Sequence, residues 1–337
     1  YRRKRAPMKE KYQGILEQID ESYRVMKAMR PLPKAGVQYF VEEMGISIAH
    51  NSNALEGNAF TFDETRLLLE KGITASTRTF REHEEIVGYK QGFDFLYRAL
   101  KEERVVDEDF IKTLHAYVLR GSEGAGEYRT IQNYVGSLTK VKYTPCPPSQ
   151  VPGKMRDYVA GLQEGISENK QIREQENVDW ERLFHALAAH HIEFEKIHPF
   201  VDGNGRTGRL LLTYEMISLG LLPVDIRYEE RERYYAGLAS YDVKAKRSTR
   251  PESKTEKMAG LIAECELRSM KIWNDIFADY RGERKNDLAG SATVGTPAPA
   301  SPAPFSAALS EAVANMPTQP GSASTLGRHT ASGNENE

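Results

Sequence analysis

Apolar residues recur at helical spacing through nearly all of the chain from residue 9 to residue 277, and this periodicity limits the possible folds most strongly. In Lys9–Met29, for example, apolar positions three or four residues apart form one stripe. Comparable stripes predict further helices at Gly36–Leu55, Glu64–Glu70, Glu82–Leu100, Asp107–Arg120, Asp179–Ile197, Arg206–Leu219, Glu229–Ala239 and Ser253–Phe277. Local signals support several helix ends: Thr61 and Glu64 form a capping-box pattern, Asp107 is a suitable N-cap and Gly72 a suitable stop. We therefore expect an all-α fold.

One segment departs from the helical pattern. Residues Thr130–Thr144 are rich in Val, Tyr, Thr and Ile, contain Gly136 and Ser137 near the middle, and are followed by prolines. This composition predicts a small β-hairpin, and the alternative is an ordinary irregular loop. A lone hairpin leaves a strand edge with which an extended peptide can pair.

The chain is expected to fall into four parts. Most residues from Ala289 to Asn334 are Ala, Gly, Ser, Thr or Pro, so this end buries too little apolar surface to offset the entropy lost on ordering. We expect an N-terminal helical region at residues 1–75, a core at 76–245, a helical extension at 246–284 and a disordered tail at 285–337.

Composition and charge exclude several classes of protein. The chain has 337 residues with 46 basic and 48 acidic side chains, a balance that argues against a dedicated nucleic-acid binder. Cys146 and Cys265 are too few for a disulfide framework. The longest apolar stretch, Leu210–Val224, is too short and too polar to cross a membrane. We expect a cytoplasmic protein, although a chain that begins with Tyr1 rather than Met indicates a fragment or a processed product.

A glycine-rich loop between two predicted helices is the most informative stretch. Pro199 ends one helix and the next is expected to begin near Arg206. Gly203 and Gly205 can both adopt positive φ, which allows successive backbone N–H groups to point into one concavity. The N-terminus of the following helix adds free N–H donors and partial positive charge. The loop is therefore predicted to bind an anion.

The charged side chains of this loop narrow the ligand class. Arg206 and Arg209 lie three residues apart, on one face of the first helical turn. Two cations at a helix N-terminus are unfavourable unless an anion lies between them, and arginine suits phosphate because its planar fork binds bidentately. Asp202 would repel a bare phosphate, but Mg²⁺ can bridge a carboxylate and phosphate oxygens. The loop therefore predicts a Mg²⁺-bound polyphosphate, most simply a nucleoside triphosphate.

Four histidines lie on or next to the helix that precedes the loop. His198 stands at the entrance to the loop and, with an ordinary pKa of roughly 6.5, is a suitable proton acceptor near neutrality. We interpret His185, His190 and His191 as structural, because no HExxH pattern or cysteine pair accompanies them.

The loop also fits GxGxxG over Gly203–Gly208, the pattern of dinucleotide-binding folds. That pattern needs a preceding β-strand within a βαβ unit, whereas a long helix precedes it here. A Walker A lysine is also absent from the loop. We therefore reject both of these nucleotide-binding folds.

The stretch His198–Arg209 matches every fixed position of the Fic family motif, HxFx(D/E)GNGRxxR, and the chain is similar to this family over roughly Gly36–Tyr280. The similarity includes Gly126-Glu-Tyr-Arg129 and the pair Tyr234 and Tyr235. The resemblance implies a helical Fic core that transfers AMP from ATP to a Ser, Thr or Tyr hydroxyl of a target protein, including the enzyme itself. The implied partners are the target protein, ATP and a second copy of the chain in a homodimer, with no nucleic acid and no membrane.

The resemblance also implies a role for each residue of the site. His198 would be the base, Asp202 would hold Mg²⁺, Arg206 would bind the β-phosphate and Arg209 the γ-phosphate. Further implied contacts are phosphate oxygens with Gly203, Asn204 and Gly205, adenine with Tyr234 and Tyr235, and the target segment with Val135 in the hairpin. The two tyrosines have an alternative interpretation as a core-facing pair. Some relatives have Asn near the adenine where this chain has Asp242.

Residues Ser52–Gly57 match the family's inhibitory motif, (S/T)xxxE(G/N), placed N-terminal to the core as in the second of its three inhibition classes. The carboxylate of Glu56 is expected to pair with Arg209 and so to remove the group that should hold the γ-phosphate. The alternative is that this segment is only a helix C-terminus, with Gly57 as the stop. In some relatives the same glutamate positions a water that removes AMP, so a bifunctional or mainly deAMPylating enzyme is a further alternative.

The sequence is also compatible with two other functions. The first is a non-catalytic adaptor that senses a nucleotide and recruits partners, against which the intact His198 and Asp202 argue. The second keeps the enzyme but transfers UMP, phosphate or phosphocholine instead of AMP.

Overall fold

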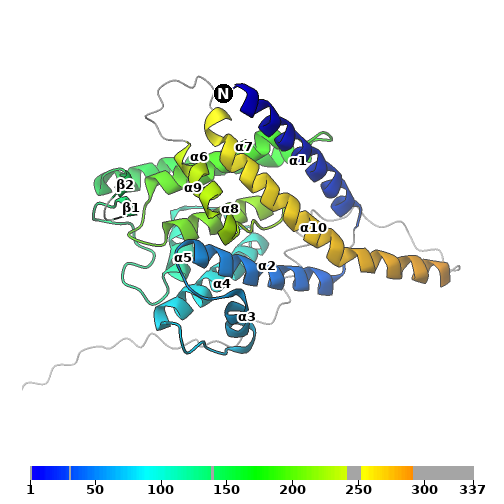
Figure 1. Ribbon diagram of the computed structural model, residues 1–337, viewed down its shortest axis with the longest axis horizontal. Coiled ribbons are helices and arrows are strands. Elements are labelled where there is room, and N and C mark those ends of the chain that lie inside the picture. Colours follow the sequence, from blue (N-terminus) through cyan, green and yellow to red (C-terminus); the bar gives the residue numbers. More distant parts are fainter. Residues whose placement is uncertain (1, 30–31, 138–139, 241–251, 291–337) are drawn as a thin grey trace, which may run out of the picture.

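The structure, a computed structural model, describes residues 2–29, 32–137, 140–240 and 252–290 (Figure 1). Most of the expected disordered tail, and Asp242, lie outside these residues. The part of the tail that is described, residues 285–290, belongs to the last helix. In the described part of the chain no helix is long and apolar enough to cross a membrane.

The all-α expectation is confirmed. The described residues form ten α-helices, two short 3₁₀ turns and one hairpin. The helices are α1 (Arg2–Ala28), α2 (Lys34–Leu55), α3 (Phe62–Lys71), α4 (Phe80–Lys101), α5 (Glu108–Val118), α6 (Val151–Glu174), α7 (Trp180–Ile197), α8 (Asn204–Ser218), α9 (Arg231–Ala239) and α10 (Glu252–Gly290), and the 3₁₀ turns are η1 (Pro148–Gln150) and η2 (Tyr228–Glu230).

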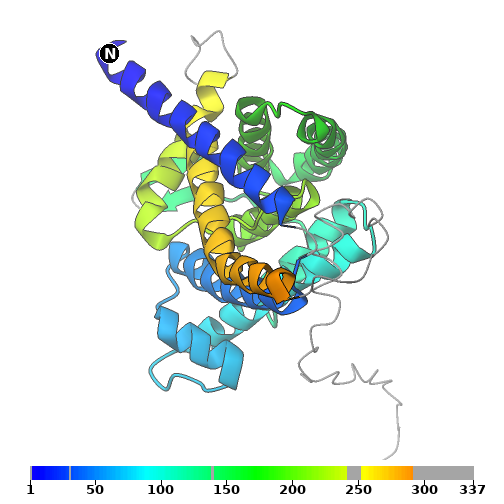
Figure 2. The same ribbon diagram turned by 90° about the vertical axis from the view of Figure 1, so that its right-hand side faces the viewer.

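Helices α7 and α8 form the centre of the molecule and lie against each other. Helix α10 packs on α7 and α9, and α1 packs along α10, so two long helices cover one side of α7 (Figures 1 and 2). Helices α4 and α5 pack on α8, while α2 packs on α4 and α3. The loop between α7 and α8 is thus supported by helices from distant parts of the sequence.

Local sequence signals account for several helix ends. Thr61 and Glu64 form a complete capping box at α3, and Gly72 ends that helix in the left-handed conformation at φ 66°. Asp107 caps α5 by accepting a hydrogen bond from the backbone N–H of Phe110. A second capping box, from Thr79 to residue 82, begins α4 two residues before the predicted start.

Helix α6 has no counterpart among the predicted helices. It begins in a proline-rich stretch, with Pro152 at the first turn, and contains three glycines, Gly153, Gly161 and Gly165. Prolines and glycines typically indicate turns, so they conceal the apolar stripe that packs α6 on α7. Proline is well tolerated in the first helical turn, where its missing N–H would have no partner in the helix.

The predicted hairpin is present. Strands β1 (Val135–Ser137) and β2 (Lys140–Tyr143) pair antiparallel, with Val135 opposite Tyr143. In the described residues this is the only sheet. The hydroxyl of Tyr143 donates to the carbonyl of Lys196 near the end of α7, so β2 is anchored beside the glycine-rich loop.

Close packing of α4 against α5 gives a test of the fold. A Cβ atom added at Gly88 of α4 would overlap the carbonyl oxygen of Tyr117 in α5. We expect Gly88→Ala to lower the free energy of unfolding by about 1–3 kcal/mol, because backbone cannot move aside as a flexible side chain does. The control is Gly161→Ala in α6, where no atom lies within 4 Å. It should be neutral or stabilising by roughly 0.5–1 kcal/mol. Urea unfolding measures both, and equal effects would contradict this packing.

Candidate active site

His198 stands at the junction of α7 and the glycine-rich loop. It is the C-cap of α7 in the left-handed conformation, with φ 49° and ψ 60°. Its Nδ1 lies 3.3 Å from the carbonyl oxygen of Glu195. Because a carbonyl oxygen only accepts hydrogen bonds, Nδ1 carries the proton and Nε2 has the free lone pair. Burial lowers the pKa of His198, so the imidazole is neutral near pH 7 and can accept a proton at Nε2.

The loop after His198 is held rigidly by polar side chains. Asn204 accepts from the backbone N–H of Phe200 at 2.9 Å and donates to its carbonyl at 2.9 Å. Asn133, just before the hairpin, donates to the same carbonyl at 2.8 Å. Asn204 was predicted to contact phosphate, but its buried side chain faces into the loop, which leaves its backbone as the group available to a ligand.

His115 of α5 packs against the same loop and bonds it. Its ring stacks on Phe200 with a centroid separation of 3.7 Å. The backbone N–H of Gly126 donates to Nδ1, so Nε2 carries the proton and donates to the carbonyl of Asp202 at 3.0 Å. Burial lowers the pKa of His115 to about 4, which keeps the ring neutral and this arrangement intact.

Helix α8 begins two residues earlier than predicted, at Asn204, with Gly203 as its N-cap at φ 73°. Of the two glycines expected at positive φ, only Gly203 has it, and Gly205 lies in the first helical turn. A Cβ atom at position 205 would overlap the carboxylate of Glu56, so a larger residue there would displace that side chain. The N-terminus of α8 is thus occupied by a carboxylate group, as expected for a site that favours anions.

Ser52 and Glu56 of the inhibitory motif hold Arg209. Its Nε donates to the hydroxyl of Ser52 and its Nη2 to the carbonyl of Ser52, both at 2.8 Å. The same Nη2 lies 2.8 Å from Oε1 of Glu56, and only 5% of the Arg209 side chain is exposed. The expected pairing of Glu56 with Arg209 is therefore present. Gly57 follows at φ 94°, which ends α2 and turns the chain away after Glu56.

Arg206 and Asp202 form a second charged group at the mouth of the loop. Arg206 is buried and contacts Glu85 of α4 at 3.2 Å, while its Nε has no hydrogen-bond partner within the described residues. Asp202 is half exposed and accepts from Arg81 at 2.8 Å and from the backbone N–H of Gly203 at 2.7 Å. A buried donor without a partner beside an accessible carboxylate is suited to a ligand that brings oxygen atoms.

The two tyrosines predicted at the adenine lie in different surroundings. Tyr234 is buried, and its hydroxyl lies 2.9 Å from Nε2 of His191 and 3.4 Å from Nη1 of Arg209. This position agrees with the core-facing alternative. Tyr235 is 42% exposed and donates to the carbonyl of Leu55 at 3.0 Å, so its ring lies at the surface next to Glu56.

The other histidines of α7 have structural partners, as expected. His185 contacts Thr255, His190 pairs with Glu215 at 2.7 Å, and His191 bonds Tyr234. Within the described residues no group of three or more His, Cys, Asp or Glu could hold a metal ion.

Several residues of the site were missed from the sequence. Arg81, Glu85 and His115 lie on α4 and α5, where nothing local distinguishes them from ordinary helix positions. Glu195 is half-buried beside Gly208, its buried Oε1 has no partner within the described residues, and desolvation raises its pKa to about 8. Arg129 could have been identified from the sequence, because it belongs to the stretch Gly126-Glu-Tyr-Arg129 that the chain shares with the Fic family.

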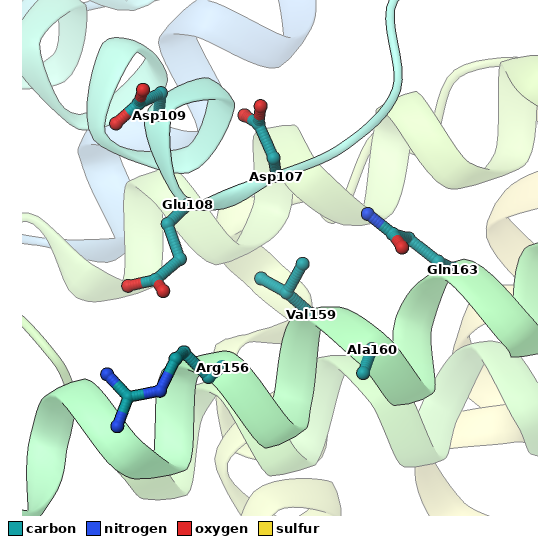
Figure 3. A pocket seen from close by; sticks show the side chains of 7 residues that line it. All are labelled: Asp107, Glu108, Asp109, Arg156, Val159, Ala160 and Gln163. Atoms are coloured by element: carbon teal, nitrogen blue, oxygen red, sulfur yellow. The ribbon is translucent and has the colours of Figure 1, made fainter.

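A surface pocket of about 340 Å³ lies elsewhere, between the start of α5 and α6 (Figure 3). It is lined by the acidic residues 107–109 and by α6 side chains that include Arg156 and Gln163. None of the predicted site residues lines it, so it is separate from the loop between α7 and α8.

Residues 105–216 match the family model described as the Fic/DOC family. The chain contains a Fic domain. The matched residues include His198, Asp202 and Arg209 but not Glu56 or Tyr234. The Fic domain thus coincides with the helices that carry the loop and its supports.

Curated relatives of the chain share the Fic name. The chain is 34% identical over 193 residues to protein adenylyltransferase fic-1 of Caenorhabditis briggsae, covering 56% of this chain and 35% of that protein. It is 30% identical over 231 residues to protein adenylyltransferase Fic of Nematostella vectensis, covering 66% and 49%. The chain therefore spans about a third to a half of the length of these relatives.

Solved structures with a Fic domain share the fold. A Fic domain containing signaling protein from Bacteroides thetaiotaomicron aligns with a TM-score of 0.66 and 25% identity, over 77% of this chain and 96% of that one. Fic-1 from C. elegans aligns with a TM-score of 0.61 over 84% and 74%, and at 24% identity this likeness concerns the fold alone.

Proposed function

We propose that the protein transfers AMP from ATP to a Ser, Thr or Tyr hydroxyl of a target protein and of itself, and that Glu56 restrains this activity. One observation carries the proposal: a neutral His198 with a free Nε2 lies beside a helix N-terminus at which Arg209 is held by a carboxylate. Relatives named protein adenylyltransferases support the same assignment.

The reaction assigns a task to each group. The target hydroxyl oxygen attacks the α-phosphorus of ATP, its proton passes to Nε2 of His198, and the bond between the α-phosphorus and the bridging oxygen to the β-phosphate breaks. Pyrophosphate leaves with the bonding electron pair. Arg206 and Arg209 bind the β- and γ-phosphates, and the backbone N–H groups at the start of α8 hold phosphate oxygens. Tyr235, at the surface, is the better placed of the two tyrosines to contact the adenine.

Mg²⁺ fits this site as a companion of ATP. Asp202 offers an accessible carboxylate, and Mg²⁺ in nucleotide sites is typically bound by one or two carboxylates together with substrate phosphates. The ion would neutralise charge that develops on the phosphates during transfer.

Asp202→Ala is expected to remove AMP transfer together with its Mg²⁺ dependence. The variant loses the carboxylate that would hold the ion, and in the Glu56→Gly background this should lower the rate by roughly two to three orders of magnitude. A Mg²⁺ titration of transfer from α-labelled ATP measures the effect. Arg81→Ala is the control, since it removes the ion-pair partner of Asp202 but keeps the carboxylate. Full activity of Asp202→Ala in excess chelator would contradict the assignment.

The target segment is proposed to bind along the hairpin, near Val135. The exposed apolar side chains Ile131, Tyr134 and Val201 lie at the base of the hairpin, next to the loop that carries His198. Strand pairing is largely independent of side-chain identity, so these apolar groups are the elements that could select a target sequence. A homodimer and a cytoplasmic location remain predictions.

Incubation with α-labelled ATP distinguishes the enzyme from a non-catalytic adaptor. In the Glu56→Gly protein, in which transfer is released, covalent label on protein is expected from the enzyme, whereas reversible binding alone would support the adaptor. Parallel incubations with γ-labelled ATP, labelled UTP and labelled CDP-choline test the other transfers. Label from any of these three in place of AMP would replace the proposed donor.

A further inference from the structure

Arg129, just before the hairpin, is almost completely buried, with 2% of its surface exposed. All of its guanidinium nitrogens donate to backbone carbonyl oxygens. The acceptors are His198 at 2.8 Å from Nε, Ile131 at 3.1 Å from Nη1, and Cys146 at 2.6 Å and Ile197 at 3.5 Å from Nη2. In addition, its backbone N–H donates to the carbonyl of Pro199 at 2.9 Å.

These contacts join three segments that the sequence separates. Ile131 lies before β1 and Cys146 after β2, so one side chain holds both ends of the hairpin. Ile197 and His198 form the end of α7, where the last carbonyls carry partial negative charge and favour a cation. A buried charge is costly unless it is hydrogen-bonded, and here the carbonyls supply that compensation.

His198 needs such support because of its backbone. A non-glycine residue in the left-handed conformation is strained, and the conformation persists only where the surrounding structure fixes it. The carbonyl of His198 is held by Nε of Arg129, and the next carbonyl by the Arg129 N–H. This backbone conformation in turn directs Nδ1 toward the carbonyl of Glu195 and leaves Nε2 free.

We propose that Arg129 is a positioning residue that fixes His198 for proton acceptance and couples both ends of the target-binding hairpin to the catalytic loop. This inference rests on the proposed function of His198 as the base. The guanidinium group of Arg129 already bonds backbone carbonyls through each of its nitrogens, so no direct contact with ATP or the target is assigned to it. It acts through the orientation of His198 and of the hairpin.

The charge of Arg129 adds a second effect. Burial is the largest cause that lowers the pKa of His198, the hydrogen bond to Glu195 opposes it, and the positive charge of Arg129 lowers it further. The other charged groups that face His198 are Glu56 of α2 and Asp202 of the loop, both of which raise the pKa. Removing the charge of Arg129 should therefore raise the pKa of His198.

The test compares Arg129→Gln with Arg129→Lys, each in a Glu56→Gly background so that transfer is measurable. We expect Arg129→Gln to lower kcat roughly ten- to a hundredfold with the Kd for ATP unchanged within about threefold, since small misplacements of catalytic groups cost this much. KM for the target should rise. Arg129→Lys keeps the charge and part of the hydrogen bonding, and should recover part of kcat.

A titration of the His198 ring by NMR, assigned by comparison with His198→Ala, needs no activity. The pKa of His198 should move up in Arg129→Gln and stay close to its original value in Arg129→Lys. The control for loss of a largely buried arginine is Arg173→Gln, because Arg173 packs on the ring of Tyr23 at the opposite end of α7. It should change neither kcat nor the His198 titration.

The outcomes separate the inference from the proposed function. No AMP transfer by the Glu56→Gly protein itself would overturn the proposed function. Transfer by that protein with unchanged kcat and His198 titration in Arg129→Gln would overturn the role of Arg129 alone. A drop in kcat matched by an equal loss of ATP affinity, or by an equal drop in Arg173→Gln, would mean a general structural role. If Arg129→Gln fails to fold, Arg129→Lys decides: an unchanged kcat and target KM would overturn the role.

Discussion

Replacing Glu56 by glycine is expected to raise AMP transfer, including self-modification, by one to several orders of magnitude. In this structure Nη2 of Arg209 pairs with the carboxylate of Glu56 at 2.8 Å. The same carboxylate lies against Gly205, where the phosphates should approach the N-terminus of α8. Removing it frees Arg209 for the γ-phosphate, which lets the α-phosphorus align with the target oxygen. Misplacement of reacting groups by about 1 Å can lower the rate on the order of a hundredfold, so a large gain is expected when the phosphates are aligned.

The control variant is Glu102→Gly. Glu102 is the C-cap of α4, as Glu56 is the C-cap of α2. Both variants therefore place a new glycine at a helix C-cap, but only Glu56→Gly changes the proposed phosphate site. Transfer from α-labelled ATP should stay at the resting level in Glu102→Gly. In the double variant Glu56→Gly with Arg209→Ala, most of the gain should be lost. An unchanged rate in Glu56→Gly would refute the inhibitory interpretation of Ser52–Gly57.

The same variant addresses the alternative of AMP removal. If Glu56 also positions a hydrolytic water, Glu56→Gly should lose the release of AMP from a premodified target while it gains transfer. Measuring both directions on one target therefore decides between a purely inhibitory and a bifunctional glutamate.

In the Glu56→Gly background, His198→Ala is expected to abolish measurable transfer while ATP still binds. Loss of a general base costs about 10²–10⁴ in rate, and no phosphate contact is assigned to His198. A loss of ATP affinity beyond about tenfold, roughly 1.4 kcal/mol, would count against this role. His185→Ala is the control on the same helix, because His185 contacts Thr255 and lies thirteen residues, about 20 Å, before His198.

The pH dependence of transfer provides a second check on His198. The neutral ring is the active form, so the rate should fall as the pH drops through the pKa of His198. Burial lowers this pKa below the ordinary 6.5. The acid limb of kcat/KM, which reports the free enzyme, should accordingly lie below pH 6.5 in the Glu56→Gly background, and a limb above that value would contradict a neutral His198.

Much of the site could be predicted from short, continuous stretches of the sequence. The loop from His198 to Arg209 is continuous, and the proline, the glycines and the periodic flanks specify a helix end, a turn and a helix start. Capping residues such as Thr61 and Asp107 determined helix ends for the same reason, because each acts on a backbone group within four residues. The local pattern did not predict α6, because its prolines and glycines are typical of a loop. Only the packing of its apolar face on α7 shows that this segment is a helix.

The pattern of residues along the chain predicts which side chains carry the proposed chemistry, whereas helix packing sets the contacts that hold those side chains in place. Packing of α2 against α4 and α8 brings Glu56 to Arg209 across 153 positions, and the path of the hairpin brings Arg129 to His198 across 69. Packing also directs the side chain of Asn204 into the loop and buries Tyr234 beneath Arg209. These contacts depend on how helices dock, and docking is set by the summed burial of many apolar side chains rather than by any short stretch of sequence.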